Sequence, residues 1–183
     1  MSDPTDNANL EAKVQLRASL VSSGCRVLDA FSGEGHVWRN VGDRIGGLGT
    51  WTRVDQRRLP GVIHADNLRV LSGIDLSNYD VIDLDAYGDP TPHLSIVTRR
   101  GFKGLVFLTA MIECNASYMR PVSSEALDLL GIPRQWARDH GRLVAPWDLL
   151  PEAWARLGWP HQRTMFSKSV RYVAARNTPL DLV

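Results

Sequence analysis

Cysteine and histidine, the residues that build disulfide frameworks and most zinc centres, are scarce and scattered in this chain. Its 183 residues include two cysteines, Cys25 and Cys114, which are too few for a disulfide framework. Neither these cysteines nor the five histidines show the close spacing of paired metal ligands. The sequence therefore predicts no metal site, and it favours a reducing, cytoplasmic setting.

Long apolar runs and an excess of one charge are also missing. No stretch approaches the roughly 18 apolar residues of a membrane span, and the first residues, MSDPTDNANLEAK, are polar and acidic, unlike a signal peptide. Lysine and arginine number 21 against 20 acidic residues. We therefore expect residues 1–9 to form a flexible tail, and we expect no membrane partner. Any contact with nucleic acid would depend on local basic clusters, which are also common on solvated surfaces. Those clusters are Arg53, Arg57, Arg58 and Arg69, and Arg99, Arg100 and Lys103.

No repeat, low-complexity tract or Pro/Gly/Ser-rich linker divides the chain, so residues 10–183 are predicted to form one domain. Strands are predicted at 26–31, 50–55, 61–66, 79–85 and 104–112, and helices at 10–22, 35–45, 67–74 and 91–100. Two further extended runs within 161–176 meet at residues 167–169, which indicates an antiparallel hairpin. This alternation predicts an α/β fold, a doubly wound and mostly parallel sheet with helices on both faces and an antiparallel C-terminal hairpin.

In such a sheet, ligands bind beyond the carboxyl ends of the strands, where the strand order reverses. The first strand ends in the sequence DAFSGEG, in which Asp29 precedes Gly33 and Gly35. Glycines let the backbone turn sharply and approach a ligand closely. The third glycine of a dinucleotide fingerprint is replaced by Trp38, and no P-loop lysine is present, which argues against a pyrophosphate site.

The next two predicted strands also end in carboxylates. Asp55 ends the second strand, where a carboxylate can accept both hydroxyls of a ribose. Asp66 ends the third and is followed by Asn67, a pair able to bind the amino edge of an adenine. The alternative is that each Asp caps the helix that follows it.

The Asp29–Gly35 loop, Asp55 and the Asp66–Asn67 pair resemble the cofactor loops of class I S-adenosylmethionine-dependent methyltransferases, and the resemblance covers nearly the whole chain. It implies a seven-stranded sheet whose last strand is antiparallel. It also implies that the glycine loop passes the methionine part of S-adenosylmethionine, that Asp55 holds the ribose, and that Asp66 and Asn67 meet the adenine. Asp29 would orient the loop and the amino group of the cofactor. The residues assigned to the cofactor site are Asp29, Phe31, Ser32, Gly33, Gly35, Asp55, Gln56, Asp66 and Asn67.

The stretch DLDAYGDP, residues 83–90, follows the predicted fourth strand. With the residues up to 110 it is similar to tRNA guanine-N2 dimethyltransferases, matching at Asp85, Gly88 and Pro90 and departing at Ala86 and Asp89. Those enzymes carry an additional RNA-binding domain, for which this chain has no room. The resemblance implies methyl transfer to an amino nitrogen of a nucleic-acid base, with RNA favoured. Asp85 would accept the N–H of the attacking amine, and Tyr87 would stack on the base; the alternative is a turn that caps the next helix.

Several alternatives remain open at this stage. Cys114 with Asn115 resembles the nucleophile motif of uridine C5-methyltransferases, although a free cysteine is more often a core residue. His93 falls near the predicted site, where it either contacts substrate or faces solvent, and the solvent-facing position is favoured. Tryptophans of the segment 131–162 either stack on bases or pack on the sheet, and packing is favoured; they are Trp136, Trp147, Trp154 and Trp159. The chain could also act on a small molecule or protein, be a noncatalytic cofactor-binding subunit, form a homodimer, or need a helper subunit.

Overall fold

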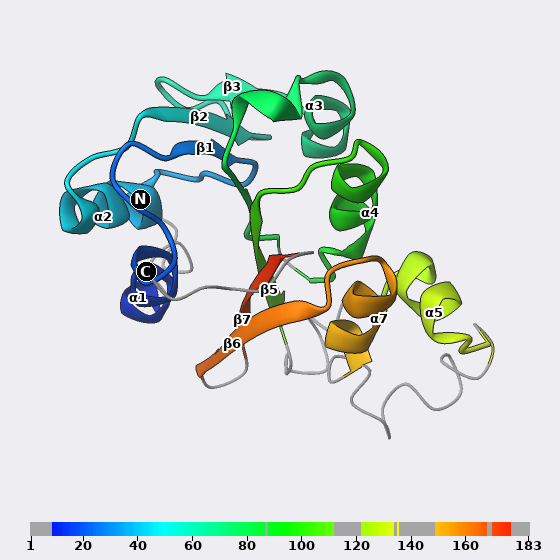
Figure 1. Ribbon diagram of the computed structural model, residues 1–183. Coiled ribbons are helices and arrows are strands. Elements are labelled where there is room, and N and C mark those ends of the chain that lie inside the picture. The colour runs from blue at the N-terminus through cyan, green and yellow to red at the C-terminus, as the bar shows by residue number, and fades with distance from the viewer. Residues whose placement is uncertain are drawn as a thin grey trace.

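The computed structural model describes residues 9–86, 88–111, 122–133, 135, 149–167 and 170–176. Its centre is a seven-stranded sheet in the order β3-β2-β1-β4-β5-β7-β6 (Figure 1). Strands β1 to β5 run parallel, and β7 runs antiparallel to both β5 and β6. The bounds are β1 Arg26–Asp29, β2 Thr50–Asp55, β3 Ile63–His64, β4 Val81–Leu84, β5 Leu105–Met111, β6 His161–Ser167 and β7 Val170–Arg176. The predicted α/β class and the antiparallel hairpin are confirmed.

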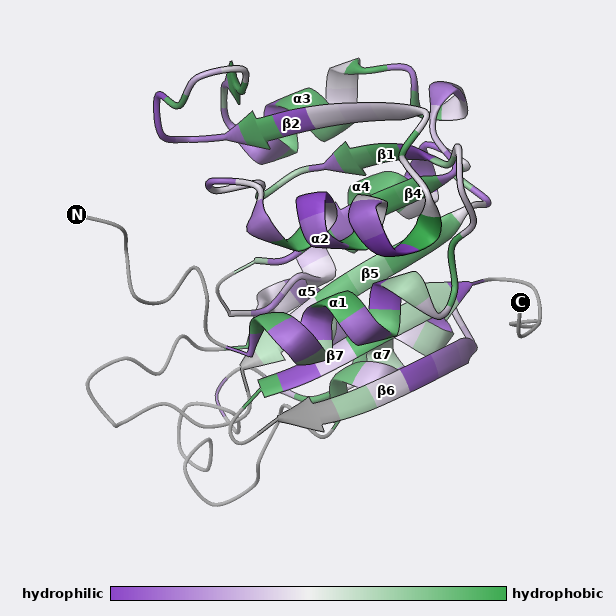
Figure 2. Ribbon diagram, turned by 90° about the vertical axis from the view of Figure 1, so that its left-hand side faces the viewer, coloured by the Kyte–Doolittle hydropathy of each residue, from purple (hydrophilic) through white to green (hydrophobic). Residues whose placement is uncertain are grey.

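Helices cover both faces of the sheet. Helices α1 (Leu10–Ala18) and α2 (His36–Ile45) lie on one face, and their outer surfaces carry hydrophilic stretches (Figure 2). The opposite face holds α3 (Asn67–Gly73), α4 (Thr91–Arg99), α5 (Ser124–Leu130) and α7 (Leu150–Arg156), while a 3-10 turn, η1 (Leu76–Asn78), leads into β4. Because the central strands are buried between two helical layers, their sequences are nearly continuous apolar runs, such as LVFLTAM in β5.

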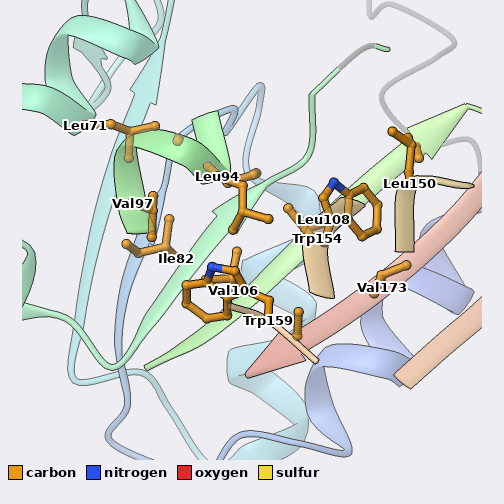
Figure 3. Close-up of a cluster of buried hydrophobic side chains, with 14 of the residues drawn as sticks. Leu71, Ile82, Leu94, Val97, Val106, Leu108, Leu150, Trp154, Trp159 and Val173 are labelled. Carbon is orange, nitrogen blue, oxygen red and sulfur yellow. The ribbon is translucent and has the colours of Figure 1, made fainter. Parts of the chain in front are cut away.

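Two tryptophans, for which the sequence allowed either base stacking or packing, are buried on the face of the sheet that α4 and α7 cover (Figure 3). Trp154 and Trp159 are 0% and 1% exposed within the cluster that includes Leu94 and Leu108. Each indole N–H is satisfied by a threonine of α4, at 3.0 Å for Trp154 and 2.7 Å for Trp159. These two residues pack on the sheet as favoured, whereas Trp136 and Trp147 lie outside the described residues.

Several predicted elements are shorter in the structure, most of all the first helix and the third strand. The first helix, expected to reach residue 22, ends at Ala18, because Leu20 and Val21 turn inward and are buried. The third strand, expected over 61–66, comprises only Ile63 and His64. It is an edge strand that pairs on one side with β2 alone, and Ile63 is exposed, so little holds a longer strand in place.

Candidate functional site

A cavity of about 160 Å³ opens at the carboxyl ends of β1 and β4. The loop after β1 and the first turn of α2 form one wall, and β5, β7 and α1 contribute the other. Its lining includes Asp29, Phe31, Ser32, Gly33, Glu34, Gly35, His36, Trp38, Asp83, Asp85, Lys13, Thr109 and Tyr172. The cavity therefore lies at the edge of the sheet where the sequence predicts a ligand, and it joins the glycine loop to the acids that follow β4.

The glycine loop is fixed by backbone conformation and by the neighbouring strand. Gly33 and Gly35 have positive φ angles of 48° and 79°, which L-residues with side chains rarely adopt. A Cβ on Gly35 would lie 2.7 Å from the ring of Trp51, closer than carbon atoms can approach. The N–H of Gly33 donates to Asp55 Oδ2 at 2.9 Å, so the acid at the end of β2 holds the loop directly.

Asp83 is the most firmly held acid of the site. Both of its oxygens accept from the Arg17 guanidinium at 2.7 Å, and Oδ2 also accepts the indole N–H of Trp38 at 2.6 Å. Asp83 and Arg17 are each 1% exposed. The pKa of Arg17 is raised: burial alone would lower it, but the adjacent Asp83 charge outweighs the effect of burial. This buried pair ties α1 to β4.

Asp85 is paired with Lys13, one helical turn before Arg17. Lys13 Nζ lies 2.5 Å from Asp85 Oδ2, and both side chains are largely buried. Burial raises the pKa of Asp85, but the positive charges of Lys13 and Arg17 outweigh that effect and leave the pKa below its ordinary value. Lys13 Nζ also lies 5.6 Å from the centre of the Tyr172 ring. Asp85 is therefore an ionised carboxylate at the cavity.

Asp29 faces the same cavity, and no described residue pairs with it as a cation. It is 4% exposed, and its Oδ2 accepts the indole N–H of Trp51 at 3.3 Å. In the sheet register Asp29 stands directly opposite Asp83. Burial, and next the negative charge of Asp83, raise the pKa of Asp29 well above its ordinary value.

The acids on the far side of the glycine loop have local partners. Asp66 caps α3 by accepting the backbone N–H of Arg69 at 2.9 Å, as the capping alternative predicts, and the side-chain amide of Gln56 lies 3.5 Å from it. Asn67 is 3% exposed, and its Oδ1 has no hydrogen-bond partner among the described residues. A buried acceptor without a donor is costly, so this oxygen is a candidate ligand contact.

His93 does not face solvent as expected. Its ring meets the Phe31 ring edge-on, with the two centres 4.9 Å apart. Its Nδ1 is buried and has no partner in the described part of the chain. Burial lowers the pKa of His93, which keeps the ring neutral near pH 7 despite the nearby Asp66 and Asp89 charges. The Asp66 charge acts on His93, so the ring lies near the start of α3, where Asn67 follows Asp66.

The comparisons with known proteins agree with the architecture. No protein-family model and no curated protein matches the sequence. Among solved structures, an O-methyltransferase family protein from Burkholderia thailandensis is 13% identical, with a TM-score of 0.56 over 97% of this chain and 57% of that protein. TYW2 from M. jannaschii in complex with AdoMet is 12% identical, with a TM-score of 0.52 over 92% and 74%. The chain shares its fold with an O-methyltransferase family protein and with an AdoMet-bound TYW2. A possible exported protein from Bordetella parapertussis shares this fold at 14% identity and a TM-score of 0.53, over 95% and 68%.

Of the predicted site residues, the structure brings Asp29, Phe31, Ser32, Gly33, Gly35 and Asp85 together at one cavity. Asp55, Gln56, Asp66 and Asn67 do not line it. Tyr87 and Cys114 lie outside the described residues. Sequence reasoning missed the residues that pair with the acids, which are Lys13, Arg17, Trp38 and Trp51. The spacing of Lys13 and Arg17 could have indicated that they act together, because residues four apart lie on the same side of a helix. In the described part of the chain, no three His, Cys, Asp or Glu side chains are placed so that they could hold a metal ion. None of the described helices is long and apolar enough to cross a membrane.

Proposed function

We propose that this protein binds S-adenosylmethionine and transfers its methyl group to an amino nitrogen of a nucleic-acid base, with RNA as the favoured acceptor. The observation that carries the proposal is the cavity that joins the glycine loop to Asp85 in a methyltransferase fold. The acceptor class rests on the resemblance of residues 85–110 described above, since fold alone does not fix a substrate.

Described residues offer polar contacts to several parts of the cofactor, and of these residues Asp29 lines the cavity whereas Asp55, Asn67 and His93 do not. The unpartnered oxygen of Asn67 can accept from an adenine amino group, and the unpartnered nitrogen of His93 adds a polar contact on the same side of the sheet. Asp55 lies against the glycine loop, where it can accept from ribose hydroxyls. Asp29 lines the cavity and can accept from an ammonium group. When bound, the cofactor supplies a methyl group on a sulfonium, which a nitrogen nucleophile can attack.

Asp85 would act on the acceptor. An exocyclic base amine is a weak nucleophile because its lone pair is delocalised into the ring. A carboxylate that accepts its N–H favours the localised lone pair and also holds the nitrogen in line with the methyl group. Lys13 keeps Asp85 ionised and contacts Oδ2 alone. A carboxylate has about four acceptor positions, so the pairing leaves acceptor capacity for the substrate.

The decisive experiment is a methyl-transfer assay with isotopically labelled cofactor and RNA, DNA and nucleoside acceptors. Asp85→Asn should lower the rate about 100-fold or more, while cofactor affinity changes only a few-fold. The matched control is Asp80→Asn, because Asp80 lies just before β4 at the opposite end of the strand and pairs with the exposed Arg26. Equal rates for wild type and Asp85→Asn would remove Asp85 from the mechanism. Binding to nucleic acid that does not weaken with added salt would argue against the acceptor class.

A noncatalytic, cofactor-binding role is the second candidate. It is favoured by the Lys13–Asp85 pair, since the carboxylate assigned to the substrate is already in contact with a cation. Such a protein would bind the cofactor with no transfer to any acceptor by the isolated chain. A Lys13→Met variant that gained activity would indicate that the Lys13–Asp85 pair prevents an acceptor from contacting Asp85.

A further inference from the structure

A second cavity, of about 580 Å³, opens at the edge of the sheet opposite the first. It lies where β4 and β5 begin and where the antiparallel β7 ends, whereas the first cavity lies at the carboxyl ends of β1 and β4. Its lining comes from η1, the residues just before β4, the loop between α4 and β5, and the end of β7. The two cavities share no lining residue, so ligands bound in them would contact different side chains.

Three cationic side chains line this second cavity. Arg100 and Lys103, which belong to one of the basic clusters of the sequence, follow α4, and Arg176 is the last residue of β7. They meet because β7 pairs antiparallel with β5, so that the end of β7 lies beside the start of β5. Phe102 is 7% exposed in the core and anchors the chain between Arg100 and Lys103. Strand pairing and core packing therefore place the three cations.

The acids of the second cavity do not neutralise these cations. Asp80 is already paired, because its two oxygens accept from the Arg26 guanidinium at 2.7 and 3.1 Å. Asp75 accepts from the N–H and the hydroxyl of Ser77 at 3.0 and 2.8 Å, and its charge acts on Arg100. Among the described lining residues, three cations are thus opposed by one acid that has no cation bound to it.

Two of the cations keep their donors for a ligand. Within the described part of the chain, neither Lys103 nor Arg176 forms a hydrogen bond or an ion pair. Arg100 differs, because its guanidinium donates to the carbonyl oxygens of Ser72 and, at 2.8 Å, of Ile74. Those carbonyls orient the guanidinium and leave its charge in place. The second cavity therefore combines one fixed positive charge with two cations that can bind an anion.

We propose that the second cavity binds a phosphate group, which Lys103 and Arg176 contact directly while Arg100 adds a fixed neighbouring charge. Ammonium and guanidinium groups are strong donors to phosphate oxygens. The excess of two positive charges over acids is balanced by a phosphate monoester, which carries about two negative charges, and not by a single carboxylate. The site is separate from the cofactor cavity, and it stands or falls independently of methyl transfer.

The phosphate can belong to a small phosphorylated molecule or to a nucleic-acid strand. Both offer the same acceptor oxygens. A strand would carry further phosphates beyond the cavity, where the exposed Arg99 adjoins Arg100. The two sources differ in their dependence on salt, because a strand releases counterions from several phosphates when it binds.

The first measurement locates the anion. Pyrophosphate is titrated into isotopically labelled protein at constant ionic strength, and the backbone amide signals are followed by NMR. We expect the signals of residues 75–80 and 100–104 to shift, and those of the glycine loop, residues 31–35, to stay unchanged.

Variants assign the binding to the cations. Lys103 is exposed, so Lys103→Gln should fold as wild type, and it should lower the affinity for pyrophosphate about tenfold because it removes a charged donor. Adding Arg176→Gln should lower the affinity further. The matched control combines Arg44→Gln with Arg156→Gln, which removes two exposed arginines that line neither cavity and should leave the affinity unchanged. If Arg176→Gln does not fold, Lys103→Gln against Arg44→Gln alone decides.

A labelled single-stranded RNA oligonucleotide separates the two sources of the phosphate. For a strand, the slope of log affinity against log salt concentration should fall by about 1 in Lys103→Gln and stay unchanged in Arg44→Gln. For a small molecule, Lys103→Gln should weaken pyrophosphate binding and leave the slope for RNA unchanged. The proposal is overturned if neither probe shifts the amides of 75–80 and 100–104, or if Lys103→Gln and Arg44→Gln bind both probes equally.

Discussion

Replacing Arg17 by Met should destabilise the protein by about 3–5 kcal/mol. Arg17 and Asp83 are each 1% exposed and share two hydrogen bonds of 2.7 Å. Without the guanidinium, Asp83 keeps the indole N–H of Trp38 as its described donor and remains a buried charge without a counter-ion. The loss is large because it includes the desolvation cost of the carboxylate left behind, beyond the strength of the pair itself.

The matched control is Arg44→Met. Arg44 pairs with Glu11 at 2.6 Å and so joins α2 to α1, as Arg17 joins α1 to β4. These side chains are 44% and 73% exposed, so water screens the pair and its loss should cost at most about 1 kcal/mol. The two variants remove the same side chain from pairs that differ in burial.

Urea unfolding followed by circular dichroism measures both variants. With a denaturant slope of about 2.5 kcal/mol/M, a loss of about 4 kcal/mol lowers the midpoint by about 1.6 M. Adding Asp83→Asn to Arg17→Met removes the stranded charge and keeps an acceptor for Trp38, so it should recover at least half of the loss. Equal midpoints for Arg17→Met and Arg44→Met would refute the reasoning, as would a double variant no more stable than Arg17→Met.

Three further predictions concern the glycine loop, the core and the pH dependence of stability. Gly35→Ala should destabilise more than Gly47→Ala in urea unfolding, because both have positive φ but only at Gly35 would a Cβ collide with Trp51; similar losses would contradict the contact argument. Trp154→Phe should cost about 1–3 kcal/mol by the same assay, because the buried Thr91 hydroxyl loses its indole donor and keeps only its bond to Asp89, and no loss would contradict this. Asp29→Asn should gain stability relative to wild type as pH rises from about 4, because folded wild type binds this proton more tightly than the unfolded chain and loses that advantage on deprotonation. Urea midpoints for both proteins at several pH values check this, and a difference that does not change with pH would refute it.

The sheet could be predicted from the sequence because its strands are buried on both faces. Short apolar runs bounded by glycine and aspartate mark β1, β4 and β5, and tertiary packing only adjusts their ends. The edge strand β3 was predicted too long for a physical reason. Its residues satisfy a strand pattern, but one neighbour and an exposed Ile63 do not stabilise six residues in extended form.

The sequence predicts the acids of the site, but it does not predict which side chains contact them. Parallel strands bring their carboxyl ends to one edge, so an aspartate at the end of each strand predicts a cluster. The partners of each acid come from elsewhere in the chain: Arg17 and Trp38 for Asp83, Lys13 for Asp85 and Trp51 for Asp29. Those contacts join residues 22 to 72 positions apart, and no local pattern encodes them.

Helix α1 shows why the chemistry of the site extends beyond the motif that suggested it. Lys13 and Arg17 are four residues apart on a helix that begins the described fold, and the sequence predicts only that they share one side. The structure turns that side toward β4, where the two cations meet two of three clustered acids. The third acid, Asp29, has the indole of Trp51 as its described donor. Removing either cation would leave a second described acid without a counter-charge, so α1 sets the charge balance at the carboxyl ends of β1 and β4.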